Sequence, residues 1–212
     1  MTESSMTEEK TIHELREEYG QAASGLLNGY HAALDEVRAT RTPAEDGYLD
    51  RLDDEQRMGL LREQKAEKAQ AVRAQAIEAA VAEHEQYQRD VRERRAFLKN
   101  RLFSVTGADG AAALTRTVTS SEEDLGALLD VALQADNAEL GRAVFVAAER
   151  RGSGDLMGRY FDALDPGARD LYAEWVDAPP DELLERQREN IPVMVREPAR
   201  EWLTPPARAG GW

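Results

Sequence analysis

One long stretch of charged residues and alanine, Arg62 to Phe103, limits what this chain can fold into. Its sequence, REQKAEKAQAVRAQAIEAAVAEHEQYQRDVRERRAFLKNRLF, is rich in the residues that most favour an α-helix. Asp53 and Gln56 form a capping-box pattern just before it, so we predict one helix from about Asp54 to Leu102. A helix of that size is about 70 Å long. Other parts of the molecule, or water, must cover it.

The apolar face predicted for this helix is thin. Its residues recur with a period of about 3.7, which is closer to an eleven-residue repeat than to the heptad of a leucine zipper. Alanine dominates the centre, so a neighbouring helix can approach to an axis separation of about 8 Å. Lys65 and Arg95 interrupt the face. The face comprises Leu61, Ala69, Val72, Ala76, Ala80, Tyr87, Val91, Leu98 and Leu102.

A shorter amphipathic helix is predicted upstream, from Ile12 to about Val37, because apolar residues recur there at steps of three and four. The sequence RTPAEDG, Arg41–Gly47, supplies a turn, so the two helices are expected to form a hairpin. The shorter helix is about 40 Å long, which leaves about 30 Å of the long helix without this partner.

A second copy of the chain, or a larger assembly, is expected to cover the remaining length of the long helix. The alternative is a solvated helix that is held by its own propensity and by ion pairs. The expected contacts with another chain are Ala76, Ala80, Tyr87, Val91 and Leu98.

Downstream of the long helix, the pattern changes to short apolar segments. SVTGADG, Ser104–Gly110, is expected to be a loop, and the β-leaning ALTRTVTSS that follows has no partner strand. Two overlapping N-caps, Ser120 with Glu123 and Ser121 with Asp124, then begin a series of helices. These are predicted at Glu122–Ala135, Ala138–Arg151, Asp155–Leu164 and Pro166–Val176, with another that begins at Asp181. We predict that they form a compact bundle of short antiparallel helices.

The predicted fold is therefore all-α, with four parts. Residues 1–11 are an acidic segment expected to be disordered, and residues 12–103 are the long helical hairpin. Residues 104–191 are the short-helix bundle, and residues 192–212 are an extended tail that contains proline and glycine. Trp202 and Trp212 in the tail are large apolar side chains and are expected to dock on a partner. The alternative is a frayed end whose tryptophans fold back onto the bundle.

The sequence contains no recognisable motif for catalysis or cofactor binding. The chain has no cysteine, which excludes thiol nucleophiles and zinc–thiolate sites. The three histidines lack the H-E-x-x-H and E-x-x-H spacings of metal sites. Sequences of the G-x-S-x-G, Walker and dinucleotide-binding types are also missing. We therefore expect a protein that is not an enzyme and uses no cofactor or metal.

Charge is distributed unevenly along the chain. The formal net charge of −14 divides into −8 for residues 1–61, +3 for residues 62–102 and −9 for residues 103–212. A basic patch near the end of the long helix could contact nucleic acid, although the acidic remainder would repel phosphate. Pairing with acidic groups of the same or a neighbouring chain is the stronger expectation. The patch comprises Arg89, Arg92, Arg94, Arg95, Lys99 and Arg101.

These features favour a non-enzymatic scaffold or adaptor that associates with itself and with another protein of a larger assembly. An acidic, cysteine-free chain rich in Ala, Arg and Glu, with one long helix, is similar in composition to scaffolding and accessory proteins of phage particles. The polar N-terminus and short apolar runs predict a soluble, cytoplasmic protein, or one within a particle assembled there. A regulatory adaptor or nucleic-acid-associated factor that uses the basic patch is the alternative.

Overall fold

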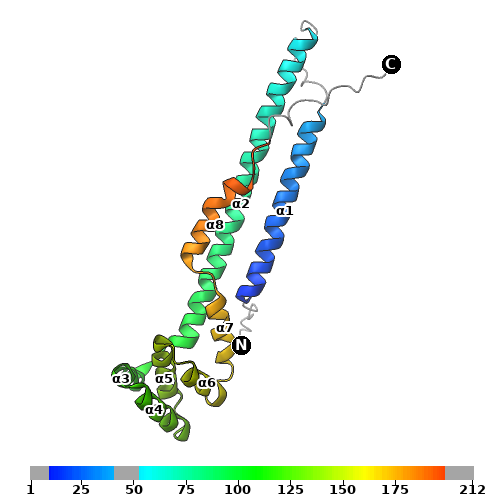
Figure 1. Cartoon of the computed structure of the whole chain (residues 1–212). Coiled ribbons are helices and arrows are strands. Elements are labelled where there is room, and N and C mark those ends of the chain that lie inside the picture. Colours follow the sequence, from blue (N-terminus) through cyan, green and yellow to red (C-terminus); the bar gives the residue numbers. More distant parts are fainter. Residues whose placement is uncertain (1–9, 41–52, 199–212) are drawn as a thin grey trace, which may run out of the picture. The chain divides into compact units, whose positions relative to one another are not determined.

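The computed structural model describes residues 10–40 and 53–198, and 86% of these residues are helical. None of them forms a strand, so the predicted all-α class is confirmed. Figure 1 shows the helices in chain order. They are α1 (Ile12–Ala39), α2 (Asp54–Phe103), α3 (Gly107–Thr119), α4 (Glu122–Gln134), α5 (Ala138–Arg151), α6 (Gly154–Ala163), α7 (Ala168–Asp177) and α8 (Asp181–Met194).

The contacts between residues group the chain into two compact units, and α2 contributes to both. The short-helix unit contains the described residues among 1–13 and 90–178, and the long-helix unit contains those among 14–89 and 179–212. The domain boundaries expected from the sequence remain a prediction. Residues 1–9, 41–52 and 199–212 lie outside the described residues, and with them most of the predicted acidic segment, the RTPAEDG turn, Trp202 and Trp212.

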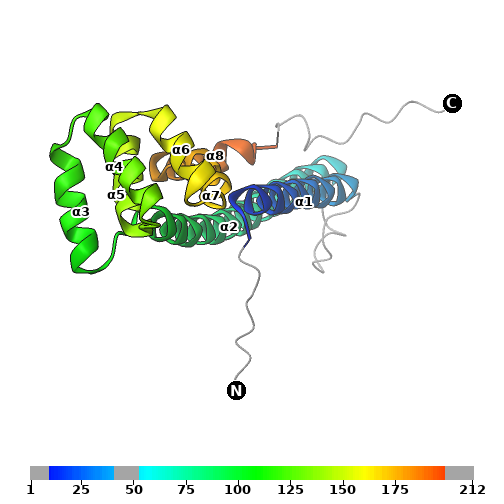
Figure 2. The same ribbon diagram turned by 90° about the horizontal axis from the view of Figure 1, so that it is seen from below.

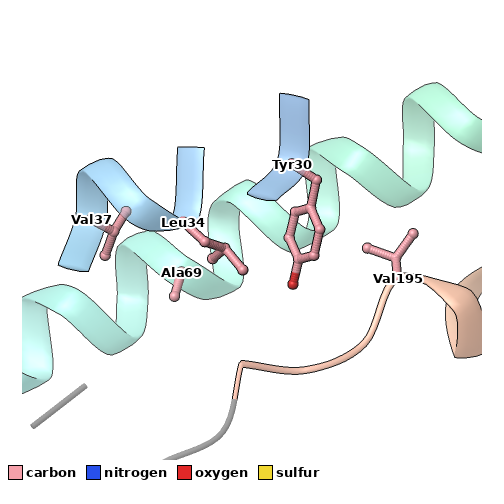
Figure 3. Close-up of a cluster of buried hydrophobic side chains, with 5 residues drawn as sticks. All are labelled: Tyr30, Leu34, Val37, Ala69 and Val195. Atoms are coloured by element: carbon pink, nitrogen blue, oxygen red, sulfur yellow. The ribbon is translucent and has the colours of Figure 1, made fainter. Parts of the chain in front are cut away.

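In the long-helix unit, α1 and α8 both lie along α2 (Figure 1). A small apolar cluster joins the three segments, and Figure 3 shows its side chains pointing toward one another. The cluster takes three residues from α1, one from α2 and one from the segment after α8, namely Tyr30, Leu34, Val37, Ala69 and Val195. The chain itself therefore supplies a second helix, α8, that covers part of α2.

Lys65, which interrupts the predicted apolar face of α2, has a structural role. Its side chain is only 2% exposed, and its Nζ donates a hydrogen bond of 2.9 Å to the backbone oxygen of Arg38. Arg38 lies in the last turn of α1, where carbonyl groups have no partner within the helix and a positive charge is favourable. Lys65 therefore caps the end of α1 from the neighbouring helix.

In the short-helix unit, α5 is the central helix and contacts α3, α4 and α6. These helices can be followed side by side in Figure 2. Phe145 of α5 is 1% exposed and lies among other aromatic rings, with Tyr160 at a centroid distance of 5.0 Å and Phe161 at 5.4 Å. Phe103 and Tyr172 complete this aromatic cluster.

Helix α3 was not predicted, because its sequence was interpreted as a loop followed by a β-leaning stretch. Its β-branched residues weaken the local helical signal. Packing against α5 overrides that signal: Thr117 is fully buried, and its hydroxyl donates to the backbone oxygen of Leu114 at 3.0 Å. Gly110 leaves room for the segment that leads into the helix, since a Cβ there would lie 2.7 Å from Cγ1 of Val105.

Local helix starts were predicted more accurately. Asp53 and Gln56 form the expected reciprocal cap, with Gln56 N donating to Asp53 Oδ1 at 2.8 Å and Asp53 N to Gln56 Oε1 at 3.1 Å. Of the two overlapping caps before α4, the structure uses Ser121 with Asp124. Helix α7 begins at Ala168, two residues later than predicted.

Helix α8 extends further than the sequence suggested. We expected an extended tail from residue 192, but α8 continues through Pro192 to Met194. Arg73 of α2 accounts for this, because its Nε donates to Val195 O at 2.9 Å and its Nη2 to Pro192 O at 3.1 Å. Carbonyl groups at a helix end need such donors. Residues 192–194, which the sequence placed in the tail, are therefore helical.

Candidate interaction surface

His84 connects all three helices of the long-helix unit. Its side chain, on α2, is 0% exposed. His84 Nε2 lies 2.8 Å from the backbone oxygen of Leu184 on α8, and His84 Nδ1 lies 3.0 Å from the hydroxyl of Tyr19 on α1. A carbonyl oxygen can only accept, so Nε2 carries a hydrogen, and in the neutral imidazole Nδ1 accepts from the Tyr19 hydroxyl. One imidazole thus satisfies a buried acceptor on α8 and a donor on α1.

Aromatic stacking surrounds this histidine. The Tyr19 ring is stacked on Tyr87, with ring centroids 4.5 Å apart, and both rings lie beside His84. Burial raises the pKa of Tyr19 above its usual value, and the neighbouring Tyr87 and Glu83 raise it further. Tyr19 therefore stays protonated and continues to donate to His84 well into the alkaline range.

Further polar contacts fix α8 and the residues after it. Arg188 of α8 pairs with Glu85 of α2 at 2.8 Å, and Arg73 reaches the two carbonyl groups described above. The Tyr30 hydroxyl donates to Arg196 O at 2.6 Å. Burial raises the pKa of Tyr30; nearby Arg73 lowers it, and Glu197 raises it again. The chain is thereby held against α1 and α2 as far as Glu197, which pairs with Arg73 at 3.6 Å.

An apolar groove, which we call the alanine groove, remains between these helices. Ala76 and Ala80, two of the five residues expected to contact another chain, lie in it and are half-buried. An exposed apolar side chain borders it at the end of α8, where Met194 is 62% exposed. The main lining residues are Leu26, Leu27, Ala76, Ala80, Ile191 and Met194.

The other three residues expected to contact a second chain are buried. Tyr87 is stacked on Tyr19, and Val91 and Leu98 are fully buried in the short-helix unit. The sequence pattern did not distinguish coverage by the same chain from coverage by another, because both need the same apolar face. Polar residues along this side of α2 could have indicated coverage by the same chain. Lys65, Arg73 and His84 all have partners within the chain.

Several arginines of the predicted basic patch are also used within the chain. Arg94 donates to both carboxylate oxygens of Glu174 at 2.8 Å, and Glu174 also accepts from the backbone N of Ile12. Arg95 lies over the ring of Trp175, and Arg101 pairs with Asp165 at 3.2 Å. Arg89 donates to Gln86 at 2.6 Å, while Arg92 and Lys99 are exposed.

No group of histidine and carboxylate side chains among the described residues has an arrangement that could hold a metal ion. Within the same residues, no helix combines the length and apolar character needed to cross a membrane. Comparisons with protein-family models, with characterised proteins and with solved structures find no match to this chain. The alanine groove therefore has to be interpreted from its own chemistry.

Proposed function

We propose that this protein is a non-enzymatic structural scaffold or adaptor that associates with itself through the alanine groove. The observation that carries the proposal is the small apolar groove at the half-buried Ala76 and Ala80, bordered by exposed Met194. Apolar area removed from water contributes about 25 cal/mol per Å², so covering this surface is favourable. A larger assembly, such as a phage-like particle, is the setting in which we propose that it acts.

The alanines determine the kind of partner that fits. The groove has a volume of only about 40 Å³ between α1, α2 and α8, so a partner helix lies over it and places an apolar side chain against the alanines. Leu26, Leu27 and Met194 at the sides of the groove then provide apolar contacts for that helix. The proposed interface uses Ala76 and Ala80 and leaves out Tyr87, Val91 and Leu98, which the chain's own residues cover.

A charge placed in the groove tests this proposal. We expect the natural chain to form a dimer or higher oligomer in light scattering, and Ala80→Glu to weaken it. A carboxylate buried at the interface would lose hydration without gaining a partner. The matched control is Ala82→Glu, which adds the same charge to the same helix at an exposed position. A natural chain that stays monomeric at high concentration would contradict self-association.

The alternative, a factor that binds nucleic acid through the basic patch, predicts different behaviour. Arg94 and Arg101 have acidic partners in the chain, which reduces the charge that they can offer to phosphate. On our proposal, a DNA or RNA titration shows no salt-dependent binding. Tight binding that weakens steeply with salt would support the alternative instead.

A further inference from the structure

A second hollow lies beside the alanine groove and is more open. It has a volume of about 410 Å³ and lies between α1 and the residues that follow α8. Its lining is mainly apolar and aromatic on the α1 side, from Leu27, Tyr30 and Leu34, and Met194 borders it from α8. We call this site the Tyr30 hollow.

The described chain ends at the rim of this hollow. Val195 is buried in the apolar cluster, Arg196 O accepts from Tyr30, and Glu197 pairs with Arg73. These three contacts hold consecutive residues against α1 and α2. Pro198, the last described residue, itself lines the hollow. The position from which the next residues depart is thus fixed.

The residues that follow Pro198 include large apolar side chains that could fill this apolar hollow. Trp202 is the fourth residue after Pro198, and Leu203 follows it. Four residues span at most about 14 Å when fully extended, so Trp202 can reach the hollow without any rearrangement of α8. Because the segment is already attached at the rim, it binds with a high effective concentration that a separate partner lacks.

We propose that the Tyr30 hollow is the docking site of the chain's own C-terminal segment, with the Trp202 indole packed against Leu27, Tyr30 and Met194. An aromatic side chain of this size buries about 150–250 Å² and brings one N–H donor. The docked segment shares Leu27, Tyr30 and Met194 with the lining of the alanine groove but leaves Ala76 and Ala80, which do not line the hollow, uncovered. The proposal does not depend on self-association.

The test follows the fluorescence of Trp202 as the sole tryptophan. In the full chain, Trp175→Phe and Trp212→Phe remove the other two, and circular dichroism checks that helicity is retained. The reference is a peptide of residues 198–212 with the same Trp212→Phe change. We expect emission at shorter wavelength than the peptide and acrylamide quenching that is several-fold slower. If acrylamide quenches Trp202 fluorescence as fast in the full chain as in the peptide, the proposal is wrong.

Variants of the hollow then identify the site. Leu27→Glu should raise quenching of Trp202 to the level of the peptide, and Met194→Glu, at a largely exposed position, should do the same without risk to the fold. The control is Val118→Glu on α3, another exposed apolar residue, which should leave quenching unchanged. If neither hollow variant changes the quenching of a protected Trp202, the indole docks elsewhere and the proposal is wrong.

Dilution separates docking within the chain from docking between chains. Protection that is independent of protein concentration supports the proposal. Protection that disappears on dilution assigns the hollow to the tail of a second copy and overturns it. The variant Ala80→Glu, measured in parallel, should weaken self-association while Trp202 remains protected, so the two proposals can fail separately.

Discussion

The short-helix unit is packed around aromatic rings, whereas the long-helix unit combines apolar contacts along its helices with polar side chains that reach backbone carbonyl groups. Phe145 is surrounded by four other aromatic rings in the first unit. In the second, Lys65, Arg73 and His84 each contact a carbonyl oxygen on a neighbouring segment. Among the described residues, the apolar cluster around Tyr30 in that unit has five buried members.

This difference follows from the alanine-rich sequence of α2. Small side chains bury little area, so apolar packing alone gives α1 and α8 a weak and poorly oriented contact with α2. Directional hydrogen bonds to carbonyl groups provide the orientation instead, at about 0.5–1.5 kcal/mol each for neutral groups. The long-helix unit should consequently be the less stable of the two and the easier to open locally.

The largest expected effect comes from removing the centre of the aromatic packing. Phe145→Ala should destabilise the short-helix unit by about 3–5 kcal/mol, because it leaves a cavity in a fully buried site. Urea denaturation and hydrogen exchange would measure this, with the loss of protection expected in α4, α5 and α6. Val131→Ala on α4, an exposed position, should have little effect. An equal loss of protection in α1 and α8 would show that the two units unfold together and would remove the basis of the comparison.

A smaller effect is expected at the polar centre of the long-helix unit. His84→Ala removes the partner of the Tyr19 hydroxyl and the second hydrogen bond of Leu184 O, and an unsatisfied buried polar group costs about 1–3 kcal/mol. Hydrogen exchange should become faster in α8, while α3 to α6 keep their protection. His31→Ala is the matched control, because His31 lies exposed on α1. Unchanged exchange in α8 would mean that Arg73 and Arg188 suffice to hold it.

These contrasts also explain which features the sequence could predict. Helix starts such as Asp53 with Gln56 depend on residues three apart, and both hydrogen bonds of that cap are present. The return of α8 to α2 depends on His84 and Leu184, which are separated by 100 positions in the sequence. The contact uses a backbone oxygen, which every residue has, so no sequence pattern marks it.

The part of the candidate site that depends on spacing within one helix was predicted, and the part that depends on distant contacts was not. Ala76 and Ala80 were singled out by their spacing on α2, and both line the alanine groove. The Tyr30 hollow could not be anticipated, since it requires α8 to continue past Pro192 and Arg73 to hold its last carbonyl groups. A proline normally indicates a helix end, and the donor that compensates for it comes from a distant helix.

The smallest expected effect concerns alkaline pH and the end of α8. Burial raises the pKa of Tyr30, so the folded chain holds this proton more tightly than the unfolded chain does. The resulting stability is complete below the unfolded value, near pH 10, and is lost as the pH rises through the folded pKa. Ionisation also replaces the donor to Arg196 O with a phenolate that repels it. We therefore expect the urea midpoint of the natural chain to fall above pH 10, and that of Tyr30→Phe to start lower and fall less.

Tyr172→Phe in the short-helix unit is the control, because burial also raises the pKa of Tyr172. It shows whether the alkaline loss of stability belongs to one unit or to both. If Tyr30→Phe loses stability with pH as steeply as the natural chain, the contact with Arg196 O contributes nothing to the alkaline transition, and Arg73 alone holds the end of α8.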